Sequence, residues 1–332
     1  MSDPKTSARR WLLLGAKLLV IALVVWFVRR TLVEGWSQLG DYQWGLGFAW
    51  LVLAGGLYLL ALCPAAVFWF CCLRALGQQP HLGETLRAYF IGHLGKYVPG
   101  KAMVVVIRAA MIGGHRVDTG VAAASVFLET LTWVASGSFL AAAYLAVRVS
   151  HQHMAVLGAV ALMALAGLPT LPPVFARLAR LAGVGRSDPQ TVAKLHRLGF
   201  RTILLGWMIM PLGWAFMGLA YWATLRGIGL AQLDAIAELP RYTAAIALAT
   251  VAGFAAIFLP AGVGVREAAL VELTIPYLRG FAPQAELVAW VSAVLIRLVS
   301  VVSELVISGI LYLIGLPRRN EPLASPPAPQ NG

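Results

Sequence analysis

The residues best suited to binding chemistry lie at two Pro-Gly turns, each set between two apolar stretches. In the first, residues 96–101 contain the turn and lead to Arg108. In the second, residues 259–265 contain the turn and lead to Arg266 and Glu267. A half-helix that begins at such a turn presents unpaired N–H groups and the positive end of its dipole, which together suit an anion. With Lys101 or Arg266 beside those groups, each turn predicts a phosphate-binding site.

The prolines and glycines of these segments predict the backbone geometry. Pro99 and Pro260 each remove a helical hydrogen bond and clash with the preceding turn, so they mark the hairpin turns. Gly100, Gly262 and Gly264 let the backbone reverse sharply and approach a headgroup closely. The alternative is a pair of ordinary interfacial turns whose Lys and Arg side chains extend to lipid headgroups.

Three further charged residues fall inside long apolar runs: Glu129, Arg297 and Glu304. A charge at the centre of a bilayer costs at least about 2.5–3.5 kcal/mol, so each is expected to face a partner or a water-filled cavity. Arg297 and Glu304 are seven residues apart and therefore share one helix face. Glu129 and Arg297 occupy corresponding places in the two halves, which predicts an ion pair between them. This polar network serves either the substrate path or only the packing of the two halves.

The elements that position these residues are predicted to be membrane helices. The 332 residues are 60% hydrophobic and 12% charged, whereas soluble domains carry about 25% charged residues. The chain is therefore expected to be an all-α polytopic membrane protein, since its charge density cannot cover a water-soluble surface. Its net charge of +12 is spread over short loops, which favours cytoplasmic loops and anionic headgroups as the partners and excludes nucleic acid.

A membrane-crossing helix needs about 20 mainly apolar residues. Six stretches satisfy this requirement: residues 11–28, 46–73, 119–147, 154–175, 203–225 and 287–316. Two others, residues 86–112 and 243–278, are interrupted by the Pro-Gly turns and are expected to form re-entrant hairpins. The single membrane domain therefore spans residues 11–316, between a cytoplasmic tail over 1–10 and a disordered Pro-rich tail over 317–332.

Each half of this domain, residues 11–147 and 154–316, has the order span, span, hairpin, span. Three crossings per half invert the second copy, and inverted repeats with broken helices are typical of transporters. If both hairpins return to the side they entered, most of the 26 Lys and Arg residues lie on one side. The positive-inside rule then makes that side cytoplasmic and predicts that both termini lie there.

Neither a catalytic motif nor a metal or cofactor site is predicted. Cys63, Cys71 and Cys72 share one apolar run and are interpreted as small buried hydrophobes. His151 and His153 lack the spacing of a metal site. We therefore expect a protein that is not an enzyme and that has no cofactor.

The two Pro-Gly segments, together with Glu129 and the polar last span, resemble the transmembrane region of lysylphosphatidylglycerol synthases, a flippase-like domain. The resemblance covers residues 11–316. It implies movement of lipids such as aminoacylated phosphatidylglycerol between leaflets, with membrane lipids as partners. The chain departs from the synthases in lacking a soluble aminoacyl-transfer domain, so aminoacylation is not implied and the lipid stays open.

The leading expectation is a flippase-like transporter of an anionic or polyprenyl-linked lipid in a bacterial plasma membrane. Lys101, Arg108 and Arg266 would then contact the headgroup. One alternative is a membrane-embedded glycosyltransferase-type enzyme with a loop carboxylate such as Asp234 or Glu238. Another is a non-catalytic scaffold that binds a lipid-synthesis enzyme. The oligomeric state is left open.

Overall fold

All secondary structure in the described part of the chain is helical, which confirms the all-α part of the predicted fold class. The computed structural model describes residues 47–98, 102–114, 116–148, 153–181, 194–195, 197–256, 259 and 262–315. Its helices are α2 (Phe48–Ala75), α3 (Leu82–His93), η1 (Leu94–Tyr97), α4 (Ala102–Ile112), α5 (Thr119–Arg148), α6 (His153–Gly167), η2 (Leu168–Thr170), α7 (Pro172–Leu181), α9 (Phe200–Gly227), α10 (Leu239–Ala255), α11 (Val265–Leu278) and α12 (Ala285–Ile314).

Four of these helices are long and apolar enough to cross a membrane. They are α2, α5, α9 and α12, each of 28 or 30 residues. At 1.5 Å per residue such helices are about 42–45 Å long, which exceeds the hydrocarbon thickness of about 30 Å. Four of the predicted spans are thereby confirmed within a few residues, and the chain is a multi-pass membrane protein. The predicted first span, residues 11–28, lies outside the described residues.

The predicted span over residues 154–175 is wrong as one continuous helix. α6 ends at Gly167 after 15 residues, about 22 Å, and the short η2 and the separate α7 follow it. Pro169 and Pro172 explain the break, because neither residue can donate a backbone hydrogen bond to a continuing helix. α7 buries Phe175 on one face and exposes Arg177 on the other, a pattern typical of a helix that lies along an interface.

Both predicted interruptions are breaks between helices. The first break separates η1, which ends at Tyr97, from α4, which begins at Ala102, and the second separates α10 from α11. Gly262 and Gly264 have φ angles of 66° and 85°, where other residues are strained, so this turn requires both glycines. Four predicted turn residues lie outside the described residues: Pro99, Gly100, Lys101 and Pro260.

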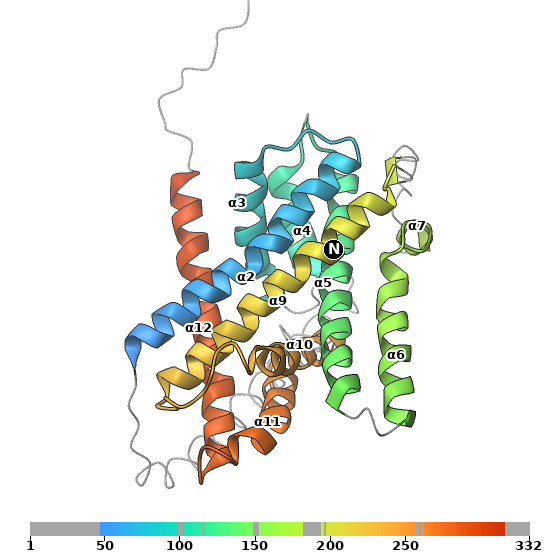
Figure 1. Ribbon diagram of the computed structural model, residues 1–332. Helices are drawn as coiled ribbons and strands as arrows, with labels where there is room; N and C mark the ends of the chain where they lie inside the picture. Colours follow the sequence, from blue (N-terminus) through green and yellow to red (C-terminus); the bar gives the residue numbers. More distant parts are fainter. Residues whose placement is uncertain are drawn as a thin grey trace, which may run out of the picture.

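We call α3, η1 and α4 the first broken element, and α10 and α11 the second. The two broken elements lie toward opposite ends of the long helices. Figure 1 shows α3 and α4 near the upper end and α10 and α11 near the lower end. α2 and α9 run side by side and make the most extensive contact in the described chain. Around them, α12 packs on α2 and α3, whereas α5 packs on α9 and α10. The contacts of the first half are thus repeated in the second half with the partners exchanged.

The beginning of α5 is held by Asp118. Its carboxylate accepts hydrogen bonds from the backbone N–H groups of Gly120 (2.8 Å) and Val121 (3.1 Å) and forms an ion pair with Lys194 (2.8 Å). Burial opposes ionisation, but the bonds from Lys194 and Val121 outweigh it and lower the pKa of Asp118. This residue therefore caps α5 and ties residues 194–195 to it.

We predict that Gly213→Ala, in α9, destabilises the contact between α2 and α9. A Cβ atom there would lie 2.7 Å from the Ala61 carbonyl oxygen, so the two helices must separate. Overpacking of this kind costs about 1–3 kcal/mol and should lower the midpoint of thermal unfolding in detergent. The matched control is Gly56→Ala in α2, where a Cβ meets nothing within 4 Å. Equal midpoints for the two variants would contradict the prediction.

Candidate functional site

The buried charged residues of the membrane body gather in one polar cluster. We use this name for Tyr58, Tyr89, His93, Lys96, Tyr97, Arg108, Glu129, Arg266, Glu267, Arg297 and Glu304. They come from α2, α3, η1, α4, α5, α11 and α12, so the cluster lies where both broken elements meet the long helices. It contains every described charged residue that the sequence placed at the Pro-Gly turns or inside the apolar spans, namely Arg108, Glu129, Arg266, Glu267, Arg297 and Glu304.

Glu304 of α12 is the carboxylate with the most partners. The side chain is 1% exposed, and its carboxylate forms an ion pair with Lys96 of η1. The hydroxyl of Tyr97 donates to its Oε2 atom (2.9 Å), and the hydroxyl of Tyr58 in α2 donates to Oε1. Three donors from two other elements therefore compensate the buried charge. Glu304 thus connects the second half of the chain to the first.

Arg108 of α4 and Glu129 of α5 form a second buried ion pair. Arg108 Nη1 lies 2.8 Å from Glu129 Oε2, and the two side chains are 2% and 4% exposed. The Tyr89 hydroxyl also donates to Glu129 (3.3 Å), and the Arg108 guanidinium lies 3.8 Å from the centre of the Tyr89 ring. Arg108 is therefore buried and engaged by protein groups, where an accessible headgroup contact was expected.

The predicted ion pair between Glu129 and Arg297 does not form. Each residue has a partner from its own half of the chain, Arg108 for Glu129 and Glu267 for Arg297. The reason is that α4 packs on α5 and α11 packs on α12, which places Arg108 beside Glu129 and Glu267 beside Arg297.

His93 joins the two ion pairs into one network. Arg108 Nη2 lies 3.2 Å from His93 Nδ1, and His93 Nε2 lies 3.6 Å from Glu304 Oε1. His93 Nε2 also lies 3.0 Å from Nζ of Lys96, so each ring nitrogen faces a donor from a cationic side chain, and a neutral imidazole can accept a hydrogen bond from only one of the two. A path of polar contacts therefore runs from Glu129 through Arg108 and His93 to Glu304.

Glu267 combines a structural role with an ionic one. Its Oε2 atom accepts a hydrogen bond from the Gly264 backbone N–H (2.7 Å), which caps the beginning of α11. Its Oε1 atom lies 3.6 Å from Nη1 of Arg297, whose guanidinium lies 5.8 Å from the centre of the Tyr97 ring. Glu267 is thus a capping residue and the ionic partner of Arg297, and it was predicted as a substrate contact.

Arg266 differs from the other cations of the polar cluster. It lies in the first turn of α11, half-buried, and interacts electrostatically with Arg297, Tyr58, Glu267 and Glu304. Yet none of the ion pairs formed by the described residues includes it. Within that part of the chain the cluster holds four cations, Lys96, Arg108, Arg266 and Arg297, against three carboxylates. The surplus positive charge suits an anion.

Sequence reasoning gave no role to Tyr58, Tyr89, His93, Lys96 or Tyr97. Lys96 and Tyr97 precede the Pro-Gly turn directly, and His93 stands three residues before Lys96, so this spacing was a usable signal. Tyr58 and Tyr89 had no such signal, because an aromatic residue in an apolar helix is usually core. Their hydroxyl contacts appear only in the folded structure.

In the part of the chain that the structure describes, no group of three His, Cys, Asp or Glu residues could hold a metal ion. What the polar cluster offers is a set of buried cations, hydroxyls and carboxylates that exchange hydrogen bonds. Such a set can bind an anionic group and can be rearranged by it.

One comparison with known proteins gave a match. The model of the family described as the lysylphosphatidylglycerol synthase TM region matches residues 14–308. The matched segment contains both broken elements and the whole polar cluster, in agreement with the resemblance seen in the sequence. No curated protein and no solved structure matches the chain.

We predict that Arg108→Met destabilises the protein far more than Arg108→Met combined with Glu129→Gln. The single change leaves a buried carboxylate without its cation, which costs about 3–5 kcal/mol. The double change removes both charges, and the new amide can still accept a hydrogen bond from Tyr89. Thermal unfolding of both variants in detergent measures the difference. Equal stability of the two would show that Glu129 does not depend on Arg108.

Proposed function

The chain belongs to the lysylphosphatidylglycerol synthase TM region family, and on that premise we propose that it moves lipids with an anionic headgroup between leaflets. The substrates of this proposal are anionic or polyprenyl-linked lipids, and the membrane is the bacterial plasma membrane. Both termini are placed on the cytoplasmic side, in keeping with the distribution of Lys and Arg residues.

The observation that carries the proposal is the surplus positive charge at Arg266. Among the residues that the structure describes, no carboxylate forms an ion pair with this guanidinium, and an uncompensated charge is costly inside an apolar helical body. Lys96 and Arg297 lie close enough to interact electrostatically with it, so an entering phosphate would meet three cations. A substrate anion is therefore the counter-charge that we propose for Arg266.

Binding at Arg266 would also change the contacts of Glu304. Lys96 has its ion pair with this carboxylate, and a phosphate held by Arg266 would be an alternative charged acceptor for its ammonium group. Transfer of Lys96 to the phosphate would loosen the connection between η1 and α12. Because the phosphate binds one arrangement better than the other, it would shift the population of the two.

The arrangement of the helices supports alternating access in this proposal. The packing of α12 on α2 and α3 corresponds to the packing of α5 on α9 and α10. Such an exchange of partners is what an inverted repeat produces, and in inverted repeats the substrate site lies near the contact between the halves. α2, which forms that contact together with α9, contributes Tyr58 to the polar cluster.

No observation favours the enzymatic alternative. The Asp234 carboxylate accepts hydrogen bonds from the backbone N–H groups of Ile236 (2.8 Å) and Ala237 (2.7 Å), which stabilises a turn. Glu238 forms an ion pair with Arg241 (2.7 Å). Both loop carboxylates named as examples for this alternative therefore have structural partners. A scaffold role is an outcome of the test below.

We predict that Arg266→Ala slows lipid transport about tenfold or more in proteoliposomes. Loss of one charge-assisted hydrogen bond costs about 1.5–3 kcal/mol, and the protein should fold, since none of the ion pairs between described residues includes Arg266. The measurement uses fluorescent phosphatidylglycerol in both leaflets and dithionite, which bleaches only the outer leaflet. The matched control is Arg279→Ala, which removes an exposed cation just after the same helix.

Full transport by Arg266→Ala would show that this residue is not the headgroup contact. If the wild-type protein moved none of several labelled anionic lipids, the transport proposal itself would fail. Recovery of a stable lipid-synthesis enzyme with the wild type and with Arg266→Ala alike would then favour the scaffold.

A further inference from the structure

A second cationic site lies away from the polar cluster and shares no residue with it. It is a cavity of about 300 Å³ between the end of α5, α10 and the second half of α11. This is the end of the body opposite to α3 and α4 (Figure 1). Its α11 residues, Leu273 and Pro276, lie about 10–15 Å along the helix from Arg266. The cavity is therefore a separate place for a ligand.

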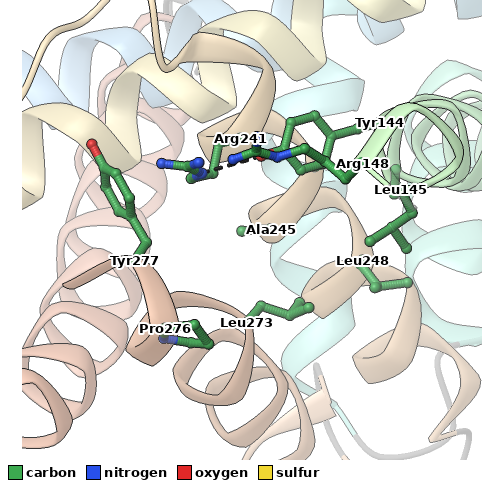
Figure 2. Close-up of a pocket in the computed structure, with 11 residues that line it drawn as sticks. Tyr144, Leu145, Arg148, Arg241, Ala245, Leu248, Leu273, Pro276 and Tyr277 are labelled. Atoms are coloured by element: carbon green, nitrogen blue, oxygen red, sulfur yellow. Dashed lines mark hydrogen bonds between the residues drawn. The ribbon is translucent and has the colours of Figure 1, made fainter. Parts of the chain in front are cut away.

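Two arginines converge at one edge of this cavity on the same neutral acceptor. The Nε atoms of Arg148 and Arg241 lie 3.2 Å and 3.1 Å from the hydroxyl oxygen of Tyr144. Figure 2 shows the three side chains gathered at this edge. A hydroxyl satisfies a donor but compensates no charge. The two cations are thus held together by an oxygen that leaves their repulsion in place.

One carboxylate offsets only part of this charge. Glu238 lies 2.7 Å from Arg241 and is itself about one third exposed. No carboxylate of the described residues forms an ion pair with Arg148, whose guanidinium lies 5.7 Å from the centre of the Tyr144 ring. The described edge therefore has a surplus of one positive charge.

The rest of the cavity is apolar. Opposite the arginines in Figure 2 lie Leu248, Leu273 and Pro276, with Ala245 between the two sides. Tyr277 closes the cationic edge with its ring face, 4.2 Å from the Arg241 guanidinium. One wall thus suits an anion and the other suits hydrocarbon, a division typical of a site for an amphiphile.

We propose that this cavity binds the phosphate-bearing headgroup of an anionic lipid. The phosphate oxygens accept hydrogen bonds from Arg148 and Arg241, and the first part of the lipid body lies against Leu248 and Leu273. The site selects lipids with net negative charge, because two guanidiniums repel an aminoacylated, cationic headgroup. The proposal concerns binding alone and does not rest on transport.

The test measures binding of water-soluble, short-chain phosphatidylglycerol to the purified full-length protein in detergent. Arg148→Ala and Arg241→Ala should each weaken binding about tenfold. Ala245→Leu, which fills the cavity and leaves its charges in place, should also weaken it. Arg226→Ala is the control, since this cation at the end of α9 is outside the cavity. Thermal unfolding of each variant checks that it folds.

Three results would overturn the proposal. Inorganic phosphate that binds as tightly as the lipid, with the same dependence on the two arginines, would make this a site for free anions. Equal binding of short-chain lysylphosphatidylglycerol would remove the claimed selectivity. Binding that survives loss of both arginines and disappears in Arg266→Ala would belong to the polar cluster.

Glu238→Gln is a variant that should bind phosphatidylglycerol more tightly than the wild type. Glu238 competes with the phosphate for Arg241, so its replacement by a neutral amide should tighten phosphatidylglycerol binding about fivefold or more. A variant that merely damages the structure would not bind more tightly. Unchanged or weaker binding by Glu238→Gln would show that Arg241 is not a ligand for the phosphate.

Discussion

The structure depends on the cost of placing the charge of Glu304 inside an apolar helical body. A carboxylate that is 1% exposed must find donors among its neighbours, and it finds them in Lys96, Tyr97 and Tyr58. Two of these residues belong to η1, the tight turn that ends the first broken element before its Pro-Gly segment. A continuous helix there would carry Lys96 and Tyr97 to other faces. The break in the backbone and the burial of the charge therefore require each other.

The other ion pairs of the polar cluster differ from this contact in what they join. Arg108 with Glu129, and Arg297 with Glu267, each connect a broken element to the long helix that follows it. Lys96 with Glu304 connects the first half of the chain to the second. Pairs within a half can survive a movement of one half against the other, whereas the pair between halves must change. His93, which contacts both Arg108 and Glu304, links the two kinds of pair.

Much of this organisation could be predicted from the sequence, because composition and proline placement act locally. The low density of charged residues predicted a membrane protein, and the Pro-Gly segments predicted where the helices break. The partner of Glu129 could not be predicted, since spacing assigns a residue to a helix face and does not identify the neighbouring helix. Tyr58 gave no signal, because α2 is apolar on all sides and its faces look alike. The cavity at Arg148 and Arg241 joins residues almost 100 positions apart, which no local pattern indicates.

The polar cluster and the cavity have the same arrangement of charged residues. Each holds more cations than carboxylates among its described residues, and each has one carboxylate, Glu304 or Glu238, paired with a cation that we propose as a ligand contact. Cations alone would bind a phosphate too tightly for release, and a site must bind weakly enough to let its ligand leave. A resident carboxylate lowers the net affinity, because it takes back the cation when the phosphate departs. On the two proposals made here, the acid beside the arginine or lysine would make lipid binding reversible in both sites.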